Sequence, residues 1–449
     1  MSKFIVLSTA LVALTLPLTG PLTGATAGAA ADVAEANPNF YRDVLPILQN
    51  NCQDCHRPAG TNFGGLIAPL SLMTYEDVRP WSKSIARQVT TREMPPWDAD
   101  ERHRGVFLNE RSLTDEEIAT VSRWVSQGSL PGDPAAAPPK REFANQDGWM
   151  IGEPDLILPM PEPFQVDDDV TDLYTAFHVD LTDDQLPGDR WITAFQCKPG
   201  SSIIHHFNVH LLAPDENGEF PEPPTFPTEG QLAPPRAGTY IGGTASGTDA
   251  LPYPEGFGLL LRKGTRVTFD IHYHKEAGPG TGLLDLSHIG FLLSDKPPTR
   301  VIGGGTDGRG PLAIYGIQIP PGAARHQLGP VSRTFTADSE IINLMPHMHM
   351  RGSEALFEAF YPDGTTEVLL HVPRYAFGWQ TVYRFKELKR IPEGTRIEFT
   401  AWYDNTAEKA ALYGFDSTET VTFGPESTDE MMMGFLTSAI VASASAGGR

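Results

Sequence analysis

The chain has 449 residues, 20% charged and 40% hydrophobic, which is long enough for about three domains and too apolar for a disordered chain. Its 56 acidic residues outnumber its 34 basic ones. The net charge of −22 argues against a nucleic-acid partner, because an acidic surface cannot replace the counterions of phosphate. The 43 glycines and 40 prolines predict a turn-rich protein, and three cysteines are too few for a disulfide framework.

The amino terminus has the pattern of a secretory signal peptide. Lys3 precedes an apolar run from Phe4 to Leu18, and small residues follow through Ala31. We therefore predict a signal peptide over residues 1–31, with an uncleaved anchor as the alternative. No later segment approaches 18 uninterrupted apolar residues, so we expect an exported periplasmic or extracellular protein without a membrane span in the mature chain.

Residues 38–130 are predicted to form a small all-α domain. Thr114 and Glu117 make a capping box at the start of a helix, and Trp81, Ile85 and Val89 recur at helical spacing, which predicts core packing of all three. A Pro/Ala-rich linker follows over residues 131–141.

From residue 142 onward the pattern is that of an all-β protein. Short β-rich runs such as Trp191–Cys197, Thr265–His274 and Arg396–Tyr403 alternate with Gly/Pro turns. The length predicts two sandwich domains, which we place at 142–296 and 297–440.

Cys52-Gln53-Asp54-Cys55-His56 is the pattern of c-type haem attachment. Two cysteines three apart can each bond a haem vinyl group, and the next histidine then reaches the iron. A redox dithiol and half a zinc site are the alternatives. The histidine, the export signal and the lack of a second Cys pair oppose both.

The sixth iron ligand is predicted to be Met94. It heads a Met-Pro-Pro-Trp run whose prolines could hold the sulfur toward iron, and Met73 is the alternative. The segment resembles small bacterial class I cytochrome c domains, in which the axial methionine lies between the middle and last helices. A thioether ligand favours a raised potential, suited to passing electrons.

Histidines cluster in the β region. Seven of 13 fall in three short windows, namely His205, His206 and His210, His272 and His274, and His347 and His349. On a strand, residues two apart share a face, so His347 and His349 can bind one metal, whereas His205 and His206 can share an ion only at a bulge or strand edge. Any one pair alone is more often structural; their coincidence favours a metal protein.

Near the carboxyl end, Met431, Met432 and Met433 follow Asp429-Glu430. Imidazole with thioether is a soft donor set that suits copper, although three methionines can also fill a core.

Together, His205-His206, His272-Tyr273, His347-Met348-His349 and Asp429-Glu430-Met431 resemble, in order and spacing, the copper type II, ascorbate-dependent monooxygenases, the family of peptidylglycine α-hydroxylating and dopamine β-monooxygenases. The resemblance covers roughly residues 150–440. It implies two nine-stranded jelly-roll-like domains facing across a cleft, each with one copper ion, and hydroxylation of a C–H bond with O2 and two electrons.

The resemblance also implies the ligands. His205, His206 and His272 would hold the electron-transfer copper, and His347, His349 and Met431 the catalytic, oxygen-binding copper. His274 would be a neighbour of the ligands or a surface residue. The remaining histidines match no ligand position and are interpreted as structural: His178, His210, His288, His326 and His371.

Three positions depart from the peptide-amidating relatives. Met345 replaces an arginine that holds a substrate carboxylate, Phe435 replaces an assisting tyrosine, and Met433 replaces an asparagine. A neutral or apolar substrate therefore fits better than a peptidylglycine. The animal enzymes carry disulfides that this chain cannot form, and Cys197 is predicted to be a buried thiol.

The sequence thus predicts an exported monooxygenase with one covalent haem c and two copper ions, acting with O2 on a small molecule. Its haem domain would replace or supplement ascorbate as reductant, and a redox partner protein is a further candidate donor. Two alternatives remain open: an electron-transfer or copper-binding protein without oxygenase turnover, and a non-catalytic sandwich module fused to a cytochrome.

Overall fold

The computed structural model describes residues 37–57, 68, 70–143, 148–220, 238–245, 250–303 and 310–441. The predicted signal peptide lies outside these residues. In the described part of the chain, no helix is both long enough and apolar enough to cross a membrane.

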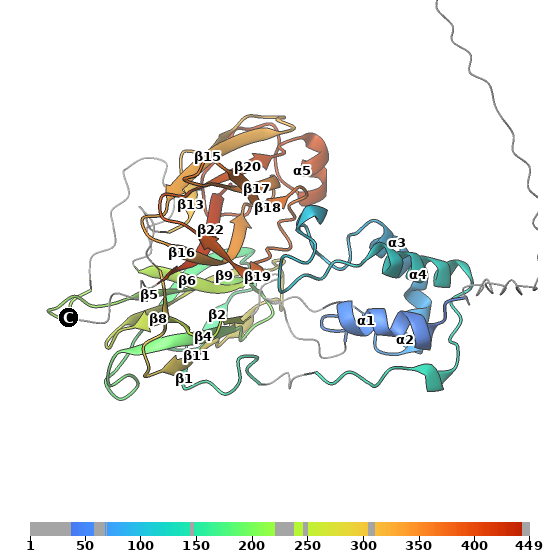
Figure 1. Cartoon of the computed structure of the whole chain (residues 1–449), viewed down its shortest axis with the longest axis horizontal. Helices are drawn as coiled ribbons and strands as arrows, with labels where there is room; N and C mark the ends of the chain where they lie inside the picture. Colours follow the sequence, from blue (N-terminus) through green and yellow to red (C-terminus); the bar gives the residue numbers. More distant parts are fainter. Residues whose placement is uncertain are drawn as a thin grey trace, which may run out of the picture. The chain divides into compact units, whose positions relative to one another are not determined.

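Short helices occupy the part of the chain before residue 137 (Figure 1). Their bounds, with one later helix, are η1 Phe40–Val44, α1 Leu45–Asn51, α2 Tyr75–Val78, η2 Arg79–Trp81, α3 Ser82–Thr90, η3 Glu101–His103, α4 Asp115–Ser126, η4 Pro134–Ala136 and α5 Ala407–Tyr413. A small core forms around Phe40, Leu48 and Trp124, which are at most 1% exposed.

The predicted capping box at α4 is confirmed. The Glu117 amide donates to Thr114 Oγ1 at 3.2 Å, and the Thr114 amide donates to Glu117 Oε2 at 2.8 Å. The predicted packing of the Trp81 stripe is wrong for Trp81 itself, which is 49% exposed. The helix α3 begins only at Ser82, so Trp81 belongs to the preceding turn and does not share the buried face of Val89.

The first set of strands runs from residue 156 to 294. Its members are β1 Leu156–Pro159, β2 Phe164–Val166, β3 Asp172–Asp180, β4 Arg190–Lys198, β5 Ile204–Leu212, β6 Thr239–Ala245, β7 Leu251–Pro252, β8 Phe257–Leu261, β9 Arg266–His274, β10 Leu283–Asp285 and β11 His288–Ser294. The sheet β3-β9-β5-β6 packs on β1-β11-β4-β8. Phe207 and Phe269 from the former and Phe195 and Phe291 from the latter share one core.

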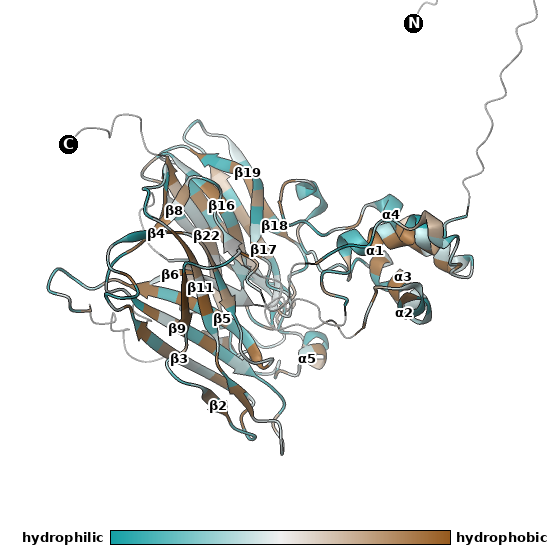
Figure 2. Ribbon diagram, turned by 90° about the horizontal axis from the view of Figure 1, so that it is seen from below, coloured by the Kyte–Doolittle hydropathy of each residue, from teal (hydrophilic) through white to brown (hydrophobic). Residues whose placement is uncertain are grey.

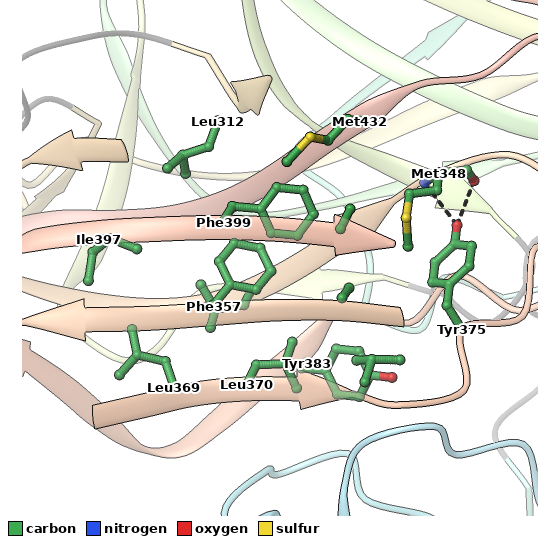
Figure 3. Close-up of a cluster of buried hydrophobic side chains, with 14 of the residues drawn as sticks. Leu312, Met348, Phe357, Leu369, Leu370, Tyr375, Tyr383, Ile397, Phe399 and Met432 are labelled. Atoms are coloured by element: carbon green, nitrogen blue, oxygen red, sulfur yellow. Dashed lines mark hydrogen bonds between the residues drawn. The ribbon is translucent and has the colours of Figure 1, made fainter. Parts of the chain in front are cut away.

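The second set runs from residue 300 to 441. It comprises β12 Arg300–Ile302, β13 Leu312–Ile314, β14 Gln318–Ile319, β15 His326–Thr334, β16 Ser339–His347, β17 Gly352–Phe360, β18 Thr366–Val372, β19 Tyr383–Ile391, β20 Arg396–Tyr403, β21 Val421–Thr422 and β22 Met432–Val441. The sheet β15-β20-β17-β18 packs on β12-β22-β16-β19 around Phe357, Phe399 and Met432 (Figure 3).

The alternation of polar and apolar residues along these strands is visible in Figure 2, as expected for strands with one buried face. The prediction of β-sandwich architecture after residue 142 is therefore confirmed at this level. One feature was not predicted: β8 pairs in parallel with β12 through Arg300 opposite Phe257, which joins β1-β11-β4-β8 and β12-β22-β16-β19 into one ten-stranded sheet.

Candidate metal centres

The first histidine cluster forms where β5 pairs with β9. The ladder sets Ile204 opposite Tyr273 and His206 opposite His272, and the register shifts between Ile204 and His206. His205 is thus the extra residue of a bulge, as sharing of one ion by His205 and His206 required. The ligand atoms of His205, His206 and His272 all lie within 4.8 Å of one another.

Hydrogen bonds show which ring nitrogens are available to a metal in this cluster. His272 Nε2 donates to Asp172 Oδ1 at 2.6 Å, whereas its Nδ1 is buried without a hydrogen-bond partner. The Nδ1 atoms of His205 and His206 lie 3.3 Å apart. An orphaned buried nitrogen beside two further imidazoles fits a metal ion, because a bound ion would satisfy the unpaired atom.

The electrostatics keep this cluster uncharged. Burial, followed by the neighbouring imidazoles, lowers the pKa of His205 to about 3 and that of His206 well below its usual value. Burial also lowers the pKa of His272, despite its bond to Asp172. Neutral imidazole is the form that binds a metal ion, so the cluster needs no proton loss at neutral pH.

Asp172 and Tyr174 come from the neighbouring strand β3. Asp172 also accepts from His274 Nδ1 at 3.1 Å, so His274 contacts the ligand-orienting carboxylate and is not itself in the cluster. The ring of Tyr174 stacks on His272 with centroids 3.8 Å apart. Both residues fix the orientation of the His272 ring.

The second histidine pair lies at the end of β16. His347 faces Met433 of β22 in the ladder, and the rings of His347 and His349 have centroids 5.3 Å apart. His347 Nδ1 donates to Gln380 Oε1 at 2.7 Å, and His349 Nδ1 donates to the Asp429 carbonyl at 3.3 Å. His347 therefore keeps Nε2 for a metal, whereas the His349 ring also bonds to the backbone of Glu426. Burial lowers both pKa values, so both rings are neutral.

The backbone around this pair is held from two sides. Between the two histidines, the Met348 amide donates to Tyr375 Oη and the Tyr375 hydroxyl donates to the Met348 carbonyl, at 3.1 and 2.7 Å (Figure 3). The fully buried Glu430 carboxylate accepts from the amides of His349 at 2.9 Å and Met431 at 3.3 Å. Met431 is thus tied at its backbone to the histidine pair.

The residues predicted for the second site, two histidines and Met431, come together through the Glu430 carboxylate, and two imidazoles with a thioether would form a soft donor set. One of the three predicted ligands is a methionine, so this site does not consist of histidine, cysteine or carboxylate ligands alone. Among the described residues, only the first cluster brings three ligand atoms of those residue types together.

Phe377 lies between the two centres. Its ring stacks on His205 of the first cluster, with centroids 5.3 Å apart, and meets the His349 ring edge-on at 5.8 Å. Phe377 is 9% exposed. One aromatic ring therefore forms a wall shared by both centres.

The predicted haem residues lie where α1 ends. The Cys52 amide bonds to the Leu48 carbonyl, and the amides of Cys55 and His56 bond to the Cys52 carbonyl, so the motif forms one tight turn. Neither cysteine is in a disulfide. His56 Nδ1 donates to the Leu70 carbonyl at 3.1 Å, so Nε2 is the ring nitrogen that would bind iron. This donor set fits a covalently attached haem.

Met94, the predicted sixth ligand, is 41% exposed. It lines a cavity of about 500 Å³ with Val89, Leu113 and Ile118, and His56 is not among the lining residues. The structure thus does not bring Met94 and His56 to one cavity wall. Met73 is partly buried, with its amide on Ser71 Oγ.

Several histidines that were interpreted as structural contact polar side chains outside the two centres. His178 Nδ1 is 2.9 Å from Thr268 Oγ1, His210 is 3.5 Å from Asp270, and His371 pairs with Asp100 and Glu354. Cys197 is a buried free thiol, and burial raises its pKa.

Four residues around the centres were not singled out as functional from the sequence: Asp172, Phe377, Gln380 and Glu430. Glu430 stands beside Met431 in a motif already noted, and that proximity was a usable signal. The other three carry no local signal, since Asp172 meets His272 across a separation of 100 residues.

Comparisons with known proteins give no family. The chain matches no protein-family model and no curated protein. Among solved structures, a Paenibacillus xanthan lyase aligns at 13% identity over 70% of this chain and 28% of its own length, with a TM-score of 0.17. The infectious bursal disease virus Gx strain structure aligns at 12% identity over 65% of this chain and 74% of its own, with a TM-score of 0.18. Likeness at this level carries no argument about function.

Proposed function

We propose that the protein is an exported haem- and copper-dependent monooxygenase that hydroxylates a C–H bond of a small neutral or apolar compound with O2. The observation that carries the proposal is the pair of imidazole centres on either side of Phe377, with the buried, unpaired Nδ1 of His272 in the first and His347 Nδ1 held by Gln380 in the second. Copper bound there would supply one-electron chemistry with oxygen.

The chain's own residues would divide the work. His205, His206 and His272 would hold one ion, with Asp172 and Tyr174 fixing ring orientation. His347, His349 and Met431 would hold the other, and Gln380 and Glu430 would fix their geometry. Cys52, Cys55 and His56 would attach the haem, with Met94 as sixth ligand.

The surroundings of His347 support an apolar substrate. The Phe435 ring lies 6.4 Å from the His347 ring between centroids, and Tyr240 of the other sandwich packs on Phe435 at 5.0 Å. Met345 sits opposite Phe435 in the ladder and is 9% exposed. Apolar and aromatic side chains of this kind recognise shape and cannot neutralise a carboxylate.

A second candidate is a haem- and copper-containing electron-transfer protein without oxygenase turnover. The packing of Phe377 directly on His205 and His349 favours it, because the ring occupies space between the centres that a substrate would otherwise enter.

Metal analysis with electron paramagnetic resonance (EPR) tests the proposal. We expect one haem and two copper ions per chain, and Met431→Ala should change one of two copper signals. Fewer than two coppers per haem would overturn the assignment. Oxygen uptake coupled to loss of an apolar C–H compound separates the oxygenase from the electron-transfer protein.

A further inference from the structure

A segment of the helical region is built into the second sandwich. Between α3 and α4, residues 97–109 (the docking segment) run beside β19, where Phe107 forms an antiparallel bridge with Phe385. The Leu108 amide donates to the Arg384 carbonyl at 2.7 Å, and the Lys386 amide donates to the Val106 carbonyl at 2.9 Å. These bonds fix the position of the segment against the sheet that carries His347.

The docking segment places the ring of Trp97 against that of Tyr383, the first residue of β19. Trp97, which is 9% exposed, meets the Tyr383 ring edge-on with centroids 5.1 Å apart. Phe107 packs on both rings, at 6.1 Å from Trp97 and 5.4 Å from Tyr383. Only Pro95 and Pro96 separate Trp97 from Met94, the predicted iron ligand.

From Tyr383 a short path leads to the second centre. The loop of residues 373–382 precedes Tyr383, and its Gln380 accepts the hydrogen bond from His347 Nδ1 at 2.7 Å. In the sheet, Tyr383 lies opposite Leu344 of β16, the strand that ends at His347. The path from Trp97 to His347 therefore crosses one ring contact, between Trp97 and Tyr383, and continues through covalent bonds and the hydrogen bond between Gln380 and His347.

The same region borders the cavity next to Met94. The cavity of about 500 Å³ is lined by Met94 and Trp97 from the helical part of the chain and by Pro373 and Arg374 from the loop. The predicted haem ligand, the aromatic contact and the loop that reaches His347 are thus neighbours around one space.

We infer that Trp97, Tyr383 and the 373–382 loop form an internal electron route from the haem to the copper held by His347, His349 and Met431. The inference rests on the proposed function and adds the route to it. With both groups bound, ferrous haem would be oxidised to ferric haem and Cu(II) reduced to Cu(I) by one electron, with no proton or atom transferred, and Trp97, Tyr383 and the loop would provide the path. Bonded atoms and packed rings transmit an electron better than solvent does, and the backbone bonds of the docking segment keep the contact between Trp97 and Tyr383 in place.

The test uses the full chain loaded with haem and copper, oxidised and free of oxygen. A flash-generated small-molecule reductant reduces the haem, and the later loss of ferrous absorbance measures transfer to copper. The variants are Trp97→Leu, Trp97→Phe and Tyr383→Leu. Phe385→Leu is the control, since Phe385 packs on Phe107 at 5.2 Å but lies outside the route.

We expect a rate independent of protein concentration in the wild type, at least a tenfold loss in Trp97→Leu and Tyr383→Leu, recovery in Trp97→Phe, and less than a twofold change in Phe385→Leu. Hydrogen exchange at the amides of Leu108 and Lys386 should show that the segment stays docked. The route is overturned if Trp97→Leu transfers as fast as the wild type or if Trp97→Phe does not recover. Absence of haem or of two coppers, measured before the flash, would instead overturn the proposed function.

Discussion

Asp172 directs the His272 ring into the first metal centre: its Oδ1 accepts from Nε2 at 2.6 Å, so Nδ1 of the same ring faces the other two imidazoles. A carboxylate in this position fixes the ring tautomer and raises the basicity of the free nitrogen. Because Asp172 is only partly exposed and also holds His274, the pair forms a rigid support for the cluster.

We predict that Asp172→Asn weakens copper binding at the first centre by about 10–100-fold, the usual effect of removing such a support. Competition titration with a copper chelator measures the affinity of each centre. Asp180→Asn is the matched control, because Asp180 lies on the same strand and pairs with Arg266 at the surface. Equal losses in the two variants would contradict the role given to Asp172.

Substitutions at Phe377 and at Gln380 should change the two copper EPR signals in different ways. Phe377 touches both centres, whereas Gln380 bonds only to His347. Phe377→Leu should therefore alter both copper EPR signals, and Gln380→Met should alter one. The Phe377 change should cost about 1–2 kcal/mol of unfolding free energy, because the smaller side chain buries less apolar surface and leaves a cavity. If Phe377→Leu leaves either signal unchanged, the shared wall is not functional.

Glu430 is expected to be a strong determinant of stability. Its buried carboxylate accepts from three amides, those of His349, Arg351 and Met431. Glu430→Ala leaves these donors unpaired, at a cost of about 1–3 kcal/mol each if water does not enter. Urea unfolding measures the loss, and copper content should fall at the second centre. Glu426→Gln, at an exposed residue of the same segment, should change neither.

The sequence was informative where the signal is local. The capping box of Thr114 and Glu117 spans three residues, and the conflict between His205 and His206 on one strand already required the bulge that the structure contains. Trp81 shows the limit of periodicity, because the spacing cannot tell where the helix begins.

What sequence could not predict depends on distant pairing. Gln380 reaches His347 across 33 residues, and the docking segment bonds to strands more than 260 residues away, as in the bond from His371 to His103. Such contacts are fixed by strand order and by the parallel pairing of β8 with β12. Neither can be predicted from composition or from the spacing of residues along the chain.

Asp98, beside the docking segment's Trp97, gives the protein a pH dependence. Burial raises the pKa of the Asp98 carboxyl to about 6, and Arg374 offsets this only in part. A raised folded-state pKa means that the fold prefers the neutral acid. The corresponding stability is fully present below the unfolded pKa, near 4, and is lost as pH rises through 6.

The expected loss between pH 4 and 7 is at most about 3 kcal/mol, from a shift of about two units. Asp98→Asn, which stays neutral, should remove this component. Urea unfolding of both proteins at intervals from pH 4 to 7 measures it: the variant's advantage over the wild type should grow with pH. An advantage that is constant across this range would mean that Asp98 does not titrate in the fold.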